Sequence, residues 1–145
     1  MNLTREAVAA VILIALTLWL QCAGMAVLIH RARTLIAHSK NGLTPWRAAV
    51  LIVRFTGLTI VLQILQVALW AGFYRSHGLS TWESCFYFSA SSYSTVGYGD
   101  VVLPGLWRIL GPVEGIVGVL MCGMSVSALL AIATKLVAAE TAPTP

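Results

Sequence analysis

The sequence predicts an all-α membrane protein in which each chain contributes three transmembrane helices and a shorter re-entrant helix followed by a loop. Two observations support this prediction. First, 59% of the 145 residues are hydrophobic and only 10% are charged, whereas soluble domains contain about 45–50% apolar and about 25% charged residues. Second, three uncharged apolar runs are each long enough to cross a hydrocarbon layer of about 30 Å as a helix. These runs are residues 7–29, 55–73 and 115–134.

The positive charges gather in one connecting segment. Residues 30–54 contain five basic residues and no acidic one, and the charges elsewhere nearly cancel to leave a net charge of +4. Because loops rich in Lys and Arg stay in the cytoplasm, we expect this loop and the C-terminal tail inside the plasma membrane, with the N-terminus and residues 74–108 outside. Anionic lipid headgroups are the expected partner of the basic loop, and no nucleic-acid partner is expected because these charges flank membrane spans. The basic residues are Arg31, Arg33, Lys40, Arg47 and Arg54.

The ends of the first two spans carry further signals. The first span is expected to be retained as a helix, because its positive charges follow it, whereas a signal peptide carries them in front. The second helix is expected to begin near Trp46, with Thr44 as its N-cap and Pro45 at its first helical position. An Asn-Gly turn precedes this start.

Several other functions find no support in the sequence. No span repeats arginine at every third position, as voltage sensing requires. We identify no nucleophile with a base, no pair of catalytic carboxylates and no phosphate-binding loop, so we do not expect an enzyme. The three cysteines are isolated from one another and the histidines lie singly, so neither a disulfide framework nor a metal site built from these side chains is predicted.

The segment between the second and third spans is too long to be a simple connection. Residues 80–83, Ser-Thr-Trp-Glu, fit a capping box with Ser80 as the N-cap and Glu83 as its reciprocal partner. A helix from Ser84 to about Tyr93 is predicted after it, too short to cross a membrane. Such a re-entrant helix is tolerated at membrane depth only where protein encloses it or where it lines water. The sequence therefore predicts an aqueous pathway.

A glycine-containing run, Ser-Thr-Val-Gly-Tyr-Gly-Asp at residues 94–100, follows this short helix directly. Gly97 and Gly99 can adopt positive φ values that are costly for other residues. Alternating backbone conformations then let successive carbonyl oxygens point the same way, where they can replace the water shell of a cation. We expect the side chains of Val96 and Tyr98 to face the opposite direction, into supporting protein. The run resembles the selectivity filter of potassium channels, and this resemblance implies as ion ligands the carbonyl oxygens of Thr95, Val96, Gly97 and Tyr98, with the Thr95 hydroxyl below them.

The Thr-Val-Gly-Tyr-Gly core of this run resembles the selectivity filter of potassium channels. The resemblance to the two-helix pore-loop family covers roughly residues 46–137. It implies passive, potassium-selective conduction, with K⁺ ions in the filter and no organic cofactor. Because one strand supplies only one side of a pore, a homotetramer is implied. The chain then divides into an N-terminal peripheral transmembrane helix (1–29), a basic cytoplasmic loop (30–45), the pore domain (46–137) and a short cytoplasmic tail (138–145).

Other residues are implied in supporting the filter. Gly99 and Asp100 close the run, and the four carboxylates of Asp100 in a tetramer would concentrate cations at the outer mouth. Ser91 stands where some potassium channels carry an acid that pairs with the aspartate after the filter. Aromatic residues 86–88 stand where some members of the family have tryptophans.

Three residues at the start of the third span or within it have two interpretations each. Glu114 could hydrogen-bond behind the filter, either protonated or paired, or it could be a solvated or capping carboxylate, because Pro112 can mark the first turn of a helix. Gly118 and Gly123 fall where the resemblance implies a gating hinge, and they could equally serve close packing between helices.

Two other functions are possible for the same sequence. One is a weakly selective cation channel of similar architecture, which the intact Gly-Tyr-Gly run disfavours. The other is a non-conducting accessory subunit whose extra N-terminal helix binds partners. Ion flux through liposomes that contain only this protein distinguishes all three functions.

Overall fold

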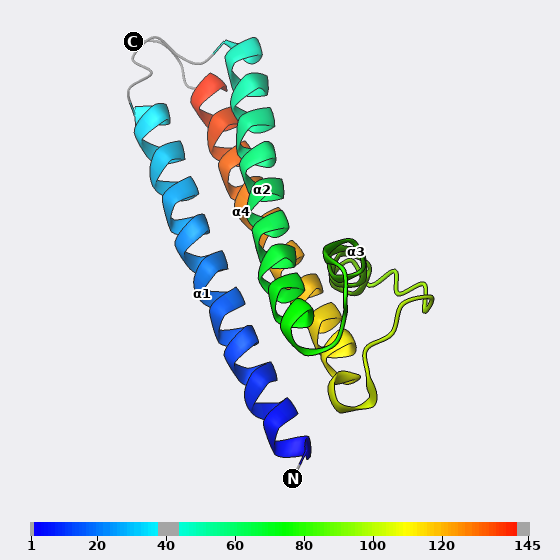
Figure 1. The fold of residues 1–145 in the computed structure, drawn as a ribbon. Coiled ribbons are helices and arrows are strands. Elements are labelled where there is room, and N and C mark those ends of the chain that lie inside the picture. The colour runs from blue at the N-terminus through cyan, green and yellow to red at the C-terminus, as the bar shows by residue number, and fades with distance from the viewer. Residues whose placement is uncertain (1, 38–43, 142–145) are drawn as a thin grey trace.

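Three long helices and one shorter helix form the described part of the structure, a computed structural model that describes residues 2–37 and 44–141 (Figure 1). The long helices, which lie side by side, are α1 (Asn2–Ala37), α2 (Pro45–His77) and α4 (Leu110–Thr141). The shorter helix α3 (Trp82–Tyr93) packs on α2 and α4, on the side away from α1. A loop and the single-turn helix η1 (Gly105–Trp107) connect α3 to α4.

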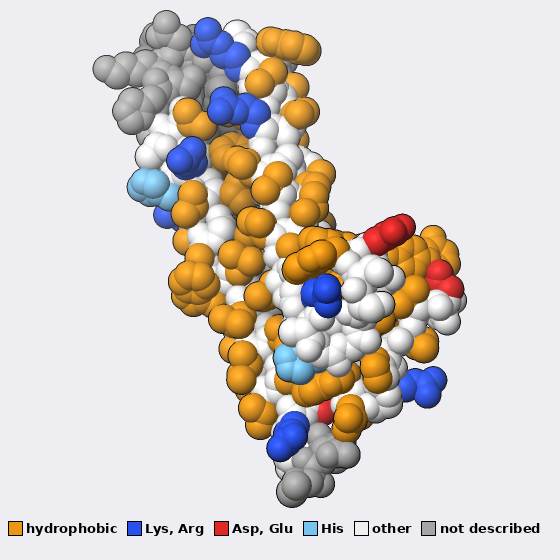
Figure 2. Space-filling model, in the orientation of Figure 1, with side chains coloured by type: hydrophobic (Ala, Val, Ile, Leu, Met, Phe, Trp, Pro, Cys, Tyr) orange, Lys and Arg blue, Asp and Glu red, His pale blue; other side chains and the backbone are white. Residues whose placement is uncertain are grey.

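Three stretches of the described residues are long and apolar enough to cross a membrane: Thr4–Leu35, Trp46–His77 and Gly105–Lys135. The predicted all-helical membrane fold is therefore confirmed, with three candidate spans and a shorter helix between the second and the third. Hydrophobic side chains cover much of the long helices in Figure 2, as expected of surfaces that face lipid. The chain is a multi-pass membrane protein.

Helix α1 is longer than predicted. It continues through Ala37, so the prediction of a loop from residue 30 is wrong for residues 30–37. The physical reason is that no glycine, proline or asparagine interrupts the chain between the apolar run and Asn41, so no residue there stops the helix. The remainder of the predicted loop up to residue 43 lies outside the described residues.

Helix α4 also extends beyond its predicted end. It continues to Thr141, so residues 138–141 of the predicted tail are helical. Ala138, Ala139 and Glu140 favour helix, and no proline lies between Pro112, in the first turn of α4, and Pro143. Residues 142–145 lie outside the described part of the chain.

The starts of α2 and α3 test two predicted caps. Helix α2 begins at Pro45 after Thr44 in an extended conformation, as predicted, although the Thr44 side chain makes no capping hydrogen bond. The predicted capping box at α3 is wrong by one residue, because the N-cap is Thr81 rather than Ser80. The Thr81 hydroxyl accepts a hydrogen bond of 3.2 Å from the backbone N–H of Ser84. This bond satisfies one of the free donors at the start of the helix.

Helix α1 packs on both α2 and α4, whereas the sequence predicts a peripheral helix. Gly24 allows the close approach of α1 to α2, since a methyl group there would come within 2.6 Å of Leu62. Apolar side chains from all three long helices share one buried cluster. Its members include Met25, Leu28, Phe55, Leu62 and Ile132. The N-terminal helix is therefore part of the core.

The cap of α3 yields a first test. Replacing Thr81 by Ala is expected to lower the free energy of unfolding by about 1 kcal/mol, because the N–H of Ser84 loses its acceptor. Replacing the neighbouring Ser80 by Ala is expected to leave stability unchanged. Thermal unfolding of the purified variants in detergent, followed by circular dichroism, measures both. Equal losses at the two positions would contradict the assignment of Thr81 as the cap.

Candidate functional site

The loop that follows α3 turns sharply at its first residues. The backbone N–H of Gly97 donates to the carbonyl oxygen of Ser91 at 3.0 Å. Gly97 and Gly99 have φ values of +51° and +80°, in the range that the sequence predicts for them. Among the described residues, Thr95 is the one non-glycine residue with a positive φ, at 63°, a conformation that the sequence does not predict for this expected ion ligand. A β-branched residue in this conformation is strained, and such strain is concentrated at functional sites.

The side chains of the loop are poorly covered within one chain. Val96 is 52% exposed and Tyr98 is 71% exposed. The ring of Tyr98 stacks on Tyr87 of α3, with 6.3 Å between their centroids and 14° between their planes. The same chain therefore supplies only a small part of the supporting protein that the sequence predicts around these two side chains.

Asp100 is held by a tyrosine of α3. The Tyr87 hydroxyl donates to Oδ2 of Asp100 at 2.8 Å, and this hydrogen bond raises the pKa of Tyr87 above its usual value. Oδ1 of Asp100 accepts from the backbone N–H of Val101 at 3.0 Å. The Ser91 hydroxyl donates instead to the carbonyl oxygen of Phe88 at 3.1 Å. Ser91 therefore contacts the loop through its backbone, and the side-chain partner of Asp100 is Tyr87.

Glu114 is fully buried where α2, α3 and α4 meet. Its carboxyl group accepts from the Tyr74 hydroxyl of α2 at 2.7 Å, and its Oε1 lies within hydrogen-bonding distance of the Ser89 hydroxyl of α3. The interpretation of Glu114 as a solvated carboxylate is therefore wrong. The partner of Glu114 in α3 is Ser89, which precedes the loop, so any support of the loop by Glu114 passes through α3. This support stays a prediction.

The contacts of Ser89 bear on the protonation of Glu114. The Ser89 hydroxyl donates to the carbonyl oxygen of Val67 at 2.9 Å and also lies within hydrogen-bonding distance of Oε1 of Glu114. A hydroxyl has one proton and cannot donate fully to both oxygens. A protonated Glu114 resolves this conflict, since its own O–H then donates to Ser89 while its other oxygen accepts from Tyr74.

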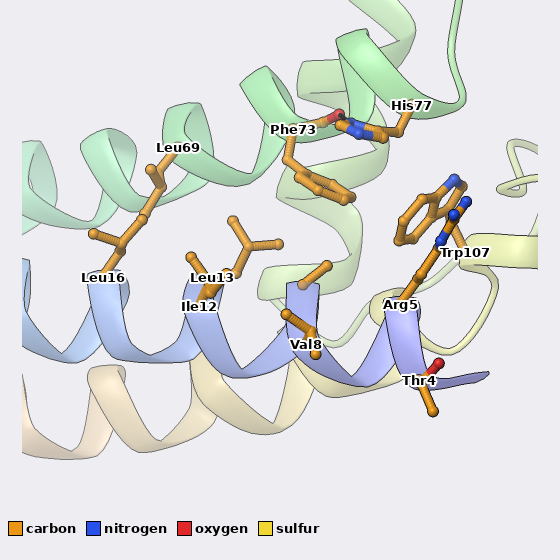
Figure 3. Close-up of a pocket in the computed structure, with 11 residues that line it drawn as sticks. Thr4, Arg5, Val8, Ile12, Leu13, Leu16, Leu69, Phe73, His77 and Trp107 are labelled. Atoms are coloured by element: carbon orange, nitrogen blue, oxygen red, sulfur yellow. Dashed lines mark hydrogen bonds between the residues drawn. The ribbon is translucent and has the colours of Figure 1, made fainter. Parts of the chain in front are cut away.

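Two hollows on the surface of the described residues differ in their relation to the loop. One, of about 520 Å³, lies between α3, the loop and the start of α4. The other, of about 590 Å³, lies between α1 and α2 and shares no lining residue with the first. Figure 3 shows its apolar wall and the grouping of Phe73, His77 and Trp107 at one end, near Arg5. The rings of Phe73 and His77 stack with their centroids 4.3 Å apart. Only the first hollow touches the loop.

The loop offers backbone oxygens rather than a cluster of charged side chains. Within the described residues, no group of three or more His, Cys, Asp and Glu side chains could hold a metal ion. The oxygen atoms that the loop offers include its carbonyl groups, the Thr95 hydroxyl and the Asp100 carboxylate. Carbonyl and hydroxyl oxygens suit a weakly hydrated monovalent cation better than a transition metal.

Comparison with known families decides the class of protein. Residues 58–135 match the family model described as ion channel, and this segment is more than half of the chain. The chain belongs to this ion channel family. No curated protein and no solved structure matches the chain. The matched segment of the channel begins within α2 and includes α3, the loop and most of α4, and it leaves out α1.

Helix α4 contacts α3 through glycines. A methyl group at Gly118 would collide with the carbonyl oxygen of Tyr93, and one at Gly115 would come within 3.1 Å of the carbonyl oxygen of Ser92. Gly123 has no atom within 4 Å of such a methyl group. Gly118 therefore packs closely against the backbone of α3, and Gly123 does not. Helix α4 is continuous past both glycines, and their role as gating hinges stays a prediction.

Substitutions of Glu114 test its protonation. Glu114→Gln is expected to lower the free energy of unfolding by less than about 1 kcal/mol, because an amide can donate to Ser89 and accept from Tyr74. Glu114→Leu is expected to lower it by about 2–3 kcal/mol, because both hydroxyl groups lose a partner. Denaturant titration of the two variants in detergent measures the difference. If Glu114→Gln were as damaging as Glu114→Leu, a protonated carboxyl group would be ruled out.

The two candidate hinge glycines make a matched pair. Gly118→Ala is expected to destabilise the channel by about 1–3 kcal/mol, because the backbone of Tyr93 cannot move aside cheaply. Gly123→Ala is expected to be neutral or stabilising, because alanine favours helix and meets open space. Unfolding in detergent measures both variants. A neutral Gly118→Ala would show that α3 and α4 are not in close backbone contact.

Proposed function

We propose that this channel conducts potassium selectively and passively across the plasma membrane, through a pore made by four copies of the chain. The observation that supports this proposal is the Thr-Val-Gly-Tyr-Gly run, placed directly after the C-terminal end of α3. Gly97 and Gly99 have the positive φ values that such a backbone needs. No organic cofactor and no covalent chemistry are part of the proposal.

The proposed ion site uses the carbonyl oxygens of Thr95, Val96, Gly97 and Tyr98, with Gly99 and Asp100 closing the run. Four such strands around an axis would surround a dehydrated K⁺ ion with oxygen dipoles in place of water. Helix α3 ends just before this run, so the partial negative charge at its C-terminal end would favour a cation near the axis. The Tyr87–Asp100 hydrogen bond and the Ser91 carbonyl support the run from α3.

Several exposed surfaces support assembly with further copies. One chain leaves Val96 and Tyr98 uncovered, and a pore strand needs protein behind it. The inner helix α4 also carries many exposed apolar side chains. Among them are Ile116, Val119, Leu120, Val126 and Leu130. In a tetramer, neighbouring chains would cover part of these surfaces, and lipid the rest.

The proposed orientation places the N-terminus outside and the C-terminus in the cytoplasm. Basic side chains gather around the end of α1 and the start of α2 (Figure 2), the end that faces the cytoplasm under the positive-inside tendency. Anionic lipid headgroups are the proposed partner of this basic end. The loop after α3 then faces the outside.

Ion flux through liposomes that contain only the purified protein tests the proposal. We expect potassium flux that barium blocks and that sodium cannot replace. Equal sodium flux would instead identify a weakly selective cation channel, and no flux would identify an accessory subunit. Counting subunits in detergent, with and without potassium, tests the tetramer.

A pair of glycine variants locates the conducting segment. Gly97→Ala is expected to reduce potassium flux by roughly tenfold or more, because each strand then takes on about 1 kcal/mol of strain at a positive φ. Gly57→Ala, at a helical position of α2 with no atom within 4 Å of the new methyl group, is expected to leave flux unchanged. Normal flux in Gly97→Ala would argue against conduction through this loop.

A further inference from the structure

Helix α1 lies outside the segment that matches the ion channel family, yet it places a polar side chain in the core. Gln21 is fully buried near the middle of α1. A buried amide within a membrane is costly unless its donors and acceptor are paired. The partners of Gln21 therefore indicate what this helix does.

The amide of Gln21 joins two other helices. Its Nε2 donates to the carbonyl oxygen of Met121 at 3.2 Å and to the Ser125 hydroxyl at 3.0 Å, both on α4. Its Oε1 accepts from Nε2 of Gln66 on α2 at 2.7 Å. Gln66 is also fully buried. One side chain of α1 thus connects α2 and α4.

The connection continues from α2 to the end of α3. Oε1 of Gln66 accepts from the hydroxyl of Tyr93. Tyr93 is the last residue of α3, immediately before the loop, and its side chain is buried with Val117 and Met121. Its backbone carbonyl faces Gly118 of α4. The position of Tyr93 therefore determines where the loop begins.

These hydrogen bonds all run in one direction. Tyr93 donates to Gln66, Gln66 donates to Gln21, and Gln21 donates to α4. Each glutamine accepts on one side and donates on the other, so turning either amide would break bonds on both sides. Without Gln21, the Gln66 amide would lose the acceptor on α1 and could turn away from Tyr93.

We propose that Gln21, Gln66 and Tyr93 form a positioning relay through which α1 holds the loop-bearing end of α3. Gln21 is then a positioning residue for ion selection, although it does not touch the ion. Helix α1 then helps to position the loop, in addition to packing beside the other helices. This inference rests on the proposed function, because the loop is taken to be the potassium filter.

The chain provides a matched control for the relay. Trp70 of α2 donates to the Thr17 hydroxyl of α1 at 3.0 Å, and both residues are fully buried. The hydroxyl of Thr17 in turn donates to Leu13 of the same helix. This bond joins the same two helices one turn from Gln21, and it does not include α3. Loss of the Trp70–Thr17 hydrogen bond is expected to lower stability and to leave the loop unchanged.

The ratio of potassium to sodium permeability in liposomes tests the relay. Gln21→Met and Tyr93→Phe are each expected to lower this ratio about threefold to tenfold, the size expected when one or two interhelical hydrogen bonds are lost. The double variant is expected to be no worse than the stronger single variant, because both changes break one relay. Thr17→Val is expected to lower thermal stability and leave the ratio unchanged.

Hydrogen exchange at the backbone amides of residues 94–99 gives a readout that does not depend on conduction. Exchange is expected to quicken in Gln21→Met and Tyr93→Phe, and not in Thr17→Val. If the protein without substitutions does not select potassium, but exchange still quickens in Gln21→Met and Tyr93→Phe and not in Thr17→Val, the proposed function fails and the relay stands.

Three results would overturn the relay. The first is an unchanged ratio and unchanged exchange in folded Gln21→Met or Tyr93→Phe. The second is a double variant whose losses add, and the third is a Thr17→Val variant with the same filter defect. If Gln21→Met does not assemble, Gln21→Asn takes its place, because it keeps the amide and shortens its reach by one methylene group. Tyr93→Phe keeps the buried ring and decides the outcome alone if neither Gln21 variant folds.

Discussion

The structure depends on one constraint, the need to pair every polar group that is buried away from water in a membrane. The hydrocarbon core offers no solvent to satisfy a hydroxyl, an amide or a carboxyl group. All buried side-chain nitrogen and oxygen atoms of the described residues have hydrogen-bond partners. Individual interhelical bonds of this kind contribute only about 0.6 kcal/mol on average, but an unpaired group costs more than a bond contributes. The polar side chains therefore specify which helix faces meet.

This constraint explains how α3 is held. Thr81 caps its first turn, and Ser89 links its middle to Glu114 of α4 and to the backbone of α2. Tyr93, the last residue of α3, donates a hydrogen bond to α2. Gly118 lets α4 approach the backbone of α3 at the same residue. Apolar packing alone would hold α3 less specifically, because the hydrophobic effect is non-directional. The start of the loop is positioned by these three links.

The loop itself is not a complete site in one chain. Thr95 has a positive φ that a β-branched residue adopts only under constraint, and the Tyr98 side chain is largely exposed. Hydrogen bonds with α3 hold the loop at Gly97, through the Ser91 carbonyl, and at Asp100, through Tyr87. The assembly of four chains proposed above would supply the missing neighbours of the exposed side chains and bring the carbonyl groups together.

The sequence by itself determined the three spans, the short helix between the last two, and the glycines with positive φ at 97 and 99. These features depend on hydropathy and turn residues that are adjacent in the chain. Only the tertiary structure decided that Tyr87 binds Asp100, that Glu114 is buried, and that Gln21 of α1 reaches α2 and α4. The physical reason is that such partners come from different helices and depend on the rotation of each helix about its axis. Helices that are apolar on nearly every side do not encode this rotation in their hydrophobic pattern.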